Sequence, residues 1–270
     1  MKFSLLISIY HKENSLYFDE AMLSIQNQTI QPNQIVLVED GILTDSLYLI
    51  IDKYKNIFKD KLTIVKLPKN KGLGTALNIG MQECIYNLIA RMDTDDIALP
   101  NRFEKQIEIF KNSDIDICSS WISEFVDTPH NIISYRKLPS SHSDIIKFAK
   151  KRSPINHPAV MYKKEAVQKA GEYKKMLGFE DYYLWVRMIL AGSKFYNIEE
   201  PLVNMRINNQ IQRRRGFKYA LNEIKLYKEF LNLGFLNFFE FLQNICIRLT
   251  IRILPTKIVK IFYNYLRASK

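Results

Sequence analysis

The chain has 270 residues, 47% of them hydrophobic and 25% charged, a composition that fits a globular protein and excludes a disordered one. Three cysteines without paired spacing exclude a disulfide framework and indicate a reducing compartment, and the four histidines do not combine with them at zinc-binding spacing. Most of the net charge of +11 comes from Leu202 onward, where 13 Lys and Arg face three Glu. This asymmetry predicts a polyanionic partner for the C-terminal part, either anionic lipid or nucleic acid.

Apolar runs alternate with amphipathic segments through the first 90 residues. The run that ends at Tyr10 has no small-residue cleavage site, and polar residues follow it at once, so it predicts a strand rather than a signal peptide. The alternation predicts βαβ units, and hence an α/β fold with a mostly parallel sheet flanked by helices. The expected strands are 3–10, 34–38, 62–65 and one at Leu88, and the expected helices are 16–25, 47–58 and one that ends at Met81.

Polar residues follow each of these predicted strands. In an open α/β sheet the ligand crevice lies at the carboxyl ends of the strands, so the polar segments are expected to meet around one site. Gly72 and Gly74 would allow a tight turn into a helix whose N-terminus faces the ligand. The segments are Tyr10-His11, Glu39-Asp40, Asn70 to Gly74 and Asp93 to Asp96.

The strongest chemical signal is Arg91-Met92-Asp93-Thr94-Asp95-Asp96, which places three carboxylates within four residues at the end of a strand. An ionised Asp is rarely buried without a partner. Carboxylates in this position predict a site for Mg²⁺ or Mn²⁺, whose coordination shell is completed by water and substrate phosphates. The alternative interpretation is an acidic loop that caps the following helix.

The second half of the sequence is less regular. Glu180-Asp181 lies between aromatic residues, and it fits either a general base or a pair that only complements a helix dipole. His157 fits a hydrogen-bonded structural histidine as well as a site residue, and Arg206 with Arg213–Arg215 fits a diphosphate contact or a solvated surface. The predicted elements are helices at 101–110, at 164–170 and from 178 onward, a strand at 115–119, and a loop near the site at 127–143.

Residues 208–270 are expected to form a basic, aromatic-rich helical extension of a domain that spans residues 1–207. Helix breaks are predicted near Gly234 and Pro255, and no apolar run is long enough to cross a membrane. Residues 237–270 are a candidate contact with an anionic membrane surface, because their last helix has the pattern of an interfacial helix. The alternative is a helix packed on the body. The apolar face of that helix would consist of Ile258, Ile261, Phe262 and Tyr265.

Nine short motifs occur in order between residues 3 and 207. They are Ser8-Ile-Tyr10, Gln26-x-Gln-Thr29, Val38-Glu-Asp40-Gly41, Asn70-x-Gly72-x-x-x-Ala76-x-Asn78-x-Gly80, Met92-Asp-Thr-Asp-Asp96, Pro100-x-Arg102, His157-Pro158, Gly171-x-Tyr173 and Glu180-Asp181. Each motif is weak alone, but as an ordered set they resemble the family 2 glycosyltransferases of the GT-A fold, particularly the bacterial enzymes of surface-polysaccharide synthesis.

The resemblance implies a metal-dependent, inverting transfer of one sugar from a nucleotide-sugar donor, UDP-linked, to a saccharide or polyprenyl-diphosphate-linked acceptor. The product would belong to O-antigen, capsule or exopolysaccharide synthesis, and the enzyme would be cytoplasmic or peripheral on the inner face of the cell membrane. The resemblance also implies residue roles. Ser8, Tyr10, Asp40 and Asn70 would bind the nucleotide sugar with Asp93 and Asp95, Asp95 and Asp96 would bind Mn²⁺ or Mg²⁺, Asp181 would be the catalytic base, and Glu180, His157 and Arg206 would lie on the acceptor or diphosphate side.

Two departures from the family pattern bear on this reading. Leu77 stands where many relatives carry Arg, and Gln210-Ile-Gln-Arg213 is followed by Arg214 rather than Trp, which favours addition of one sugar over processive synthesis. One competing interpretation is a metal-dependent nucleotidyltransferase, although Tyr10-His11-Lys12 contains no glycine of a phosphate loop. The other is a nucleic-acid-binding module, which only the basic tail supports; nucleic acid is therefore not an expected partner.

Overall fold

The computed structural model describes residues 1–207 and 216–253. The chain divides into two compact units. The first unit, Met1–Lys175 with Glu180–Ile207, contains a nine-stranded sheet and the helices that cover it. The second unit consists of Met176–Phe179 and Asn208–Lys270, and its described residues form two long helices. The catalytic, nucleotide-sugar, metal and acceptor-side residues expected from the family resemblance all belong to the first unit.

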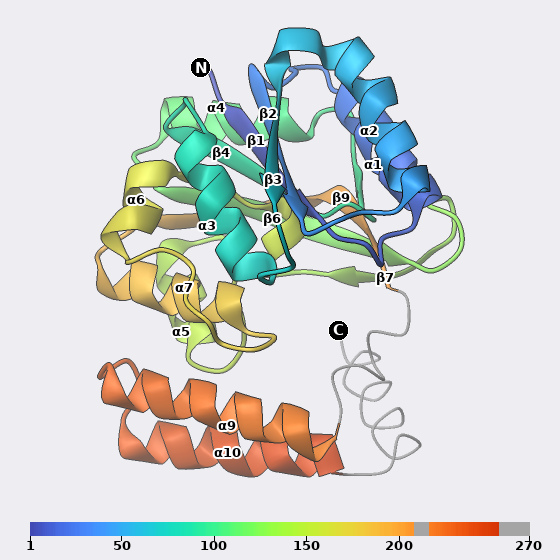
Figure 1. Ribbon diagram of the computed structural model, residues 1–270. Coiled ribbons are helices and arrows are strands. Elements are labelled where there is room, and N and C mark those ends of the chain that lie inside the picture. The colour runs from blue at the N-terminus through green and yellow to red at the C-terminus, as the bar shows by residue number, and fades with distance from the viewer. Residues whose placement is uncertain (208–215, 254–270) are drawn as a thin grey trace. The chain divides into compact units, whose positions relative to one another are not determined.

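Four parallel strands in the order β3-β2-β1-β4 form the first half of the sheet (Figure 1). They are β1 (Ser4–Ile9), β2 (Gln34–Asp40), β3 (Leu62–Leu67) and β4 (Leu88–Met92). β1 and β2 are buried almost throughout, as expected for central strands of a parallel sheet that is covered on both faces. Because the strands are parallel, the polar segments that follow them lie along one edge of the sheet.

The remaining strands make the sheet a mixed one. They are β5 (Ile97–Ala98), β6 (Ile117–Phe125), β7 (Ile132–Arg136), β8 (Met161–Lys163) and β9 (Phe195–Arg206). β8 runs antiparallel to both β4 and β6, β6 runs parallel to β9, and β5 and β7 are antiparallel to β9 and β6. The prediction of an α/β fold with flanking helices is confirmed.

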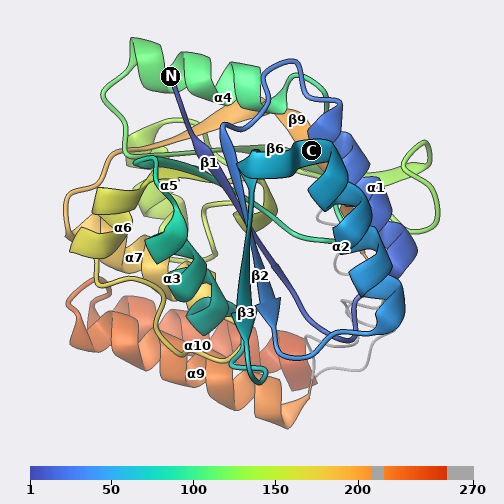
Figure 2. The ribbon, with the colours of Figure 1, turned by 45° about the horizontal axis from the view of Figure 1, so that its top comes forward.

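Helices cover both faces of the sheet (Figures 1 and 2). One face packs against α1 (Ser15–Gln26), α2 (Asp45–Phe58) and α4 (Arg102–Asn112), and the other against α3 (Leu73–Glu83), α5 (His142–Ala149), α6 (Lys164–Lys169) and α7 (Glu180–Leu190). Gly80 allows α3 to lie close to the sheet, since a Cβ there would be 2.5 Å from both Leu6 Cδ1 and Val38 Cγ2.

The prediction of a loop at 127–143 is wrong, because this segment contains β7 and the first residues of α5. β7 pairs with β6, and its exposed Ile133 and Tyr135 alternate with half-buried residues. Such a strand has no continuous apolar run for a sequence pattern to reveal. β9 was also not predicted: it contains Pro201, which lies at an irregularity in the pairing with β6.

The second unit contains a hairpin of α9 (Phe217–Asn232) and α10 (Phe238–Ile253). The break predicted near Gly234 is confirmed: this glycine has φ +72° and lies in the turn between the two helices. Phe230 packs against Phe235 and Tyr227, and Arg248 Nε lies 3.6 Å from Glu223 Oε1. The predicted break at Pro255 and the interfacial helix at 257–265 lie outside the described residues.

Candidate active site

The acidic stretch forms the connection between β4 and β5. Arg91, which is almost fully buried at the end of β4, binds both carboxylate oxygens of Asp93, with Nη1 2.6 Å from Oδ2. Asp96 is buried, and its Oδ1 accepts a hydrogen bond of 2.9 Å from the Arg206 backbone N–H. Asp96 Oδ2 has no hydrogen-bond partner within the described chain. One buried carboxylate oxygen is therefore left for a further ligand.

The electrostatics of this turn favour a bound cation. Burial, followed by repulsion from Asp93 and Glu13, raises the pKa of Asp95 to about 7, and burial with repulsion from Asp93 and Asp95 raises the pKa of Asp96 well above its ordinary value. A divalent cation would offset this repulsion. No group of three or more His, Cys, Asp or Glu with metal-binding geometry occurs in the described ranges. Asp95 and Asp96 fit instead the type of site in which one or two carboxylates share a cation with water and phosphate.

Arg206 holds the acidic turn from the end of β9. Its guanidinium is 1% exposed, donates from Nε to the Asp95 carbonyl oxygen at 3.2 Å, and forms an ion pair with Glu20 of α1. It lies 3.8 Å from the ring centroid of Tyr17 and 4.5 Å from that of Phe125. These contacts, together with the backbone hydrogen bond to Asp96, indicate that Arg206 positions the two aspartates.

Glu13 is a site residue that the sequence reasoning missed. Its Oε1 accepts from the Asn14 backbone N–H at 2.8 Å, and its Oε2 accepts from the Thr94 hydroxyl at 2.5 Å. Glu13 thereby connects the segment after β1, which contains Tyr10, to the acidic turn. The sequence did carry a signal for Glu13: it lies shortly after the first strand, and the other polar segments of the predicted site also follow strands.

Asp40 joins the ends of β2 and β3. Its Oδ1 accepts from the Lys71 backbone N–H at 2.6 Å, its Oδ2 accepts from that of Gly72 at 3.0 Å, and its carbonyl accepts from Asn70 Nδ2 at 3.3 Å. The two loops approach so closely that a Cβ on Gly41 would lie 2.7 Å from the Asn70 backbone nitrogen. Ser8 lies in the neighbouring strand β1 in register with Val38, and Tyr10 directly follows that strand and is 38% exposed.

His157 belongs to an aromatic cluster at the start of a short 3-10 helix, His157–Ala159. Its Nε2 lies 3.0 Å from the Tyr173 hydroxyl, and its ring contacts those of Tyr173 and Trp185. Burial and the nearby Arg91 charge lower the pKa of His157 well below its ordinary value. Tyr173 is in turn fixed by Asn78, whose side chain makes hydrogen bonds of 2.9 and 2.8 Å to its backbone N–H and carbonyl.

Glu180 and Asp181 occupy the first turn of α7. Burial raises the pKa of Tyr173, Arg91 lowers it, and the Asp181 and Asp93 carboxylates add to the rise, so Asp181 and the acidic stretch act on the same hydroxyl. Glu180 lies beside the start of α3, where a Cβ on Gly74 would be 3.4 Å from Glu180 Cγ. The acidic turn and the start of α7 therefore both act on Tyr173, whereas the predicted residues Ser8, Tyr10, Asp40 and Asn70 form a further group at the ends of β1, β2 and β3.

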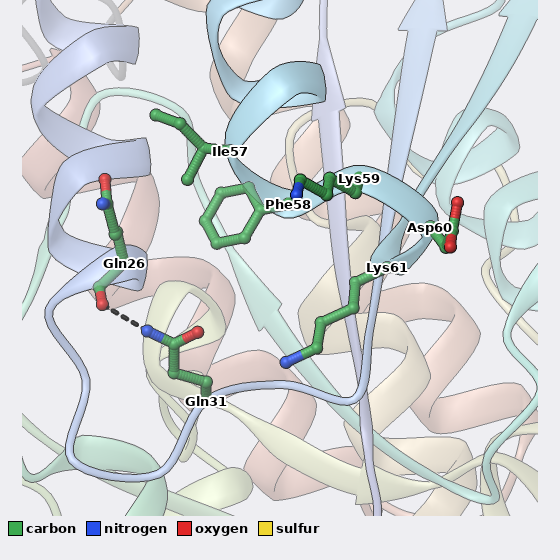
Figure 3. A pocket seen from close by; sticks show the side chains of 7 residues that line it. All are labelled: Gln26, Gln31, Ile57, Phe58, Lys59, Asp60 and Lys61. Carbon is green, nitrogen blue, oxygen red and sulfur yellow. Dashed lines mark hydrogen bonds between the residues drawn. The ribbon is translucent and has the colours of Figure 1, made fainter.

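A surface hollow of about 460 Å³ lies elsewhere (Figure 3). It is formed by the C-terminal ends of α1 and α2 and by the turn before β3. The hollow therefore lies near the amino end of β3, away from the carboxyl edge of the sheet. Its lining residues are Gln26, Gln31, Ile57, Phe58, Lys59, Asp60 and Lys61. None of them belongs to the predicted site. Gln210 and Arg213–Arg215 lie outside the described residues.

Comparison with known proteins assigns the class. The model of the family described as "Glycosyl transferase family 2" matches residues 4–171, which include β1 to β4, the acidic turn and His157. The chain belongs to this family and is a glycosyltransferase.

Two bacterial relatives match nearly the whole chain. One is the UDP-Gal:alpha-D-GlcNAc-diphosphoundecaprenol beta-1,3-galactosyltransferase of Escherichia coli, 39% identical over 94% of this chain and 92% of that protein. The other is the amylovoran biosynthesis glycosyltransferase AmsE of Erwinia amylovora, 37% identical over 97% of this chain and 98% of that protein. The resemblance to bacterial enzymes of polysaccharide synthesis is confirmed.

The fold agrees with a solved glycosyltransferase. S. aureus TarS, residues 1–349, in complex with UDP-GlcNAc matches with a TM-score of 0.68 at 17% identity, over 93% of this chain and 72% of that one. The predicted GT-A fold is confirmed.

Proposed function

We propose that this protein is an inverting, cation-dependent glycosyltransferase that moves one sugar from a UDP-linked donor to a lipid-linked saccharide. The observation that carries the proposal is that Asp93 of the acidic turn and Asp181 of α7 both act on the Tyr173 hydroxyl, while Glu180 lies beside the start of α3, which follows β3. This arrangement supplies both a site for the leaving diphosphate and a carboxylate for the acceptor. Family membership decides against the nucleotidyltransferase and the nucleic-acid-binding module.

The donor site consists of the segments that follow β1, β2 and β3. Ser8 and Tyr10 would contact the nucleotide together with Asp40, and Asn70 would complete that side. The hydrogen bonds from Lys71 and Gly72 to Asp40 hold this part of the site in place before the donor binds, which lowers the entropic cost of binding. A UDP donor is the choice supported by the name of the E. coli relative.

Asp95 and Asp96 would hold Mn²⁺ or Mg²⁺. The unpartnered Asp96 Oδ2 and the mutual repulsion of the aspartates support this assignment. The cation supplies charge that offsets the negative charge developing on the diphosphate as the sugar leaves. Arg206 and Glu13 keep the turn in position from two sides.

Asp181 would accept the proton of the acceptor hydroxyl. The hydroxyl oxygen then forms its bond to the anomeric carbon while the bond from that carbon to the diphosphate breaks. A single displacement of this kind inverts the anomeric configuration. His157 contacts the Tyr173 hydroxyl, and burial and the Arg91 charge lower the pKa of its ring, so it would shape the acceptor side by hydrogen bonding rather than by charge.

The acceptor class is inferred from the E. coli relative, whose name gives GlcNAc linked to diphosphoundecaprenol. An acceptor of this kind would place the enzyme at the inner face of the cell membrane. The relative AmsE is named for amylovoran biosynthesis, and this supports a role in a surface polysaccharide.

The test is a transfer assay with purified protein, a synthetic GlcNAc-diphospho-lipid and a panel of UDP-sugars, with Mn²⁺ or with chelator. We expect one sugar to be added from one UDP-sugar, only with the cation, and NMR to show the inverted anomeric configuration. Asp96→Asn should abolish transfer, whereas Asp60→Asn, an exposed substitution far from the edge, should not. A retained configuration, or full activity in chelator, would refute the proposal.

A further inference from the structure

The turn between α9 and α10, together with α10 itself, exposes several large apolar side chains. Phe239 is 80% exposed and Phe238 is 57% exposed, at the first two residues of the helix. We call the whole surface the apolar edge of the hairpin. It comprises Leu233, Phe238, Phe239, Leu242 and Ile247, all exposed.

The apolar edge is not left over from an incomplete core. The hairpin has its own buried apolar residues, among them Leu226, Tyr227 and Phe230 of α9 and Phe235 of the turn. Single exposed apolar residues are ordinary, but a contiguous exposed patch marks an interaction surface. Two adjacent phenylalanines at a helix start form such a patch, and their rings contact each other with centroids 6.2 Å apart.

Basic residues accompany this edge. α9 exposes Lys218, Lys225 and Lys228. Residues 216–253 contain five Lys and Arg against three Glu, of which Glu223 is buried beside Arg248. Aromatic and aliphatic side chains beside clustered Lys and Arg are the pattern of a surface that lies on anionic lipid, where each basic residue near the membrane adds attraction.

We infer that the apolar edge of the α9–α10 hairpin docks on an anionic lipid bilayer. The charges select this occupant over a second copy of the chain, because two copies would bring like charges together. In the described ranges no helix is long and apolar enough to cross a membrane, so the contact would be peripheral. The inference rests on the proposed function in one respect: docking would bring the active site to an acceptor that is held in the bilayer.

The test is sedimentation of the full chain with vesicles of phosphatidylcholine alone or mixed with phosphatidylglycerol. Wild type should bind the mixed vesicles, and binding should weaken as salt increases. The double substitution Phe238→Ser with Phe239→Ser should weaken binding by about tenfold or more, because serine has no aromatic ring to move from water into the lipid. Leu49→Ser, which changes an equally exposed residue of α2, is the matched control and should bind like wild type.

Several outcomes separate this inference from the proposed reaction. Transfer to a water-soluble acceptor analogue should be unchanged in the double variant, and its sedimentation coefficient without vesicles should match that of wild type. Wild-type binding by the double variant, or a dimer that the variant dissociates, would overturn the inference. If the double variant does not fold, Lys225→Glu with Lys228→Glu must reduce binding to the mixed vesicles. A protein that binds vesicles but transfers no sugar would refute the reaction and leave the docking surface standing.

Discussion

Among single residues, the proposed mechanism depends most on the proton acceptor. We expect Asp181→Asn to bind the UDP-sugar with near-normal affinity, because the nucleotide and cation contacts lie on other segments. Transfer should slow by about 10² to 10⁴-fold, since an amide keeps the shape of the side chain but cannot take a proton at neutral pH. Calorimetry measures donor affinity, and a single-turnover assay measures the chemical step.

Glu180→Gln is the matched control for that substitution. Glu180 precedes Asp181 in the same helical turn, so the two changes remove equal charge from the same helix N-terminus. If Asp181 only complemented the helix dipole, both variants would lose about 1 kcal/mol of stability and keep their turnover. If Asp181→Asn transferred sugar at the wild-type rate, Asp181 would not be the catalytic base.

Arg206 gives a second prediction at this scale. Arg206→Lys should lower the free energy of unfolding by about 2 to 4 kcal/mol, because an ammonium group cannot replace the buried guanidinium contacts with Asp95 and Glu20. The affinity for Mn²⁺ with UDP should fall as well, since the acidic turn loses its support. Urea unfolding and titration calorimetry measure the two effects. Glu20→Gln, which changes the exposed side of the ion pair, should cost less than about 1 kcal/mol.

His157 predicts a pH dependence of stability. Its pKa is lowered in the folded protein, so between that value and the ordinary pKa near about 6.5 the unfolded chain binds more protons than the native chain. Stability from this residue is present above that ordinary pKa and is lost as the pH falls below it. His157→Gln should therefore flatten the decrease in stability between about pH 7 and pH 5, by up to about 1.4 kcal/mol per pH unit. An unchanged slope, equal to that of the exposed control His11→Gln, would contradict this.

At the scale of elements, the close approach of α3 to the sheet positions the loop that Asp40 holds. Gly80→Val should destabilise the protein by about 1 to 3 kcal/mol or more, because the added atoms would overlap Leu6 and Val38. Urea unfolding measures the change. Gly74→Ala is the control in the same helix: its Cβ would find its nearest neighbours at 3.4 Å, so the better helix propensity of alanine should leave stability equal or higher.

For the whole molecule, cation and nucleotide should stabilise the fold together. Ligands that bind only the native state raise its stability by about 2.7 kcal/mol at a hundredfold excess over Kd. For a chain of this size that corresponds to a rise in Tm of about 5 to 10 °C. We expect this rise with Mn²⁺ and UDP together, a much smaller one with UDP alone, and in Asp96→Ala no more than the rise with UDP alone. An equal rise with UDP in chelator would argue against a cation at Asp95 and Asp96.

The features that the sequence predicted well depend on neighbouring residues. In the sequence the buried strands β1, β2 and β4 appear as apolar runs, and the helices between them appear as amphipathic segments. Burial of a strand or of one helix face requires apolar side chains at positions that are close in the chain. The acidic stretch was recognisable for the same reason, as three aspartates within four residues after a strand. The rule that parallel strands end at one edge then placed the segments along that edge of the sheet.

The features that only the tertiary structure decided depend on distant residues. The ion pair of Arg206 with Glu20 joins positions 186 apart in the chain, and the hydrogen bond from Thr94 to Glu13 joins positions 81 apart. β7 and β9 are strands because β6 supplies their backbone partners, although their own side chains lack a clear period. Arg206 could be read from the sequence as a diphosphate contact or a surface residue, and its burial between Tyr17 and Phe125 follows from packing that no local pattern records.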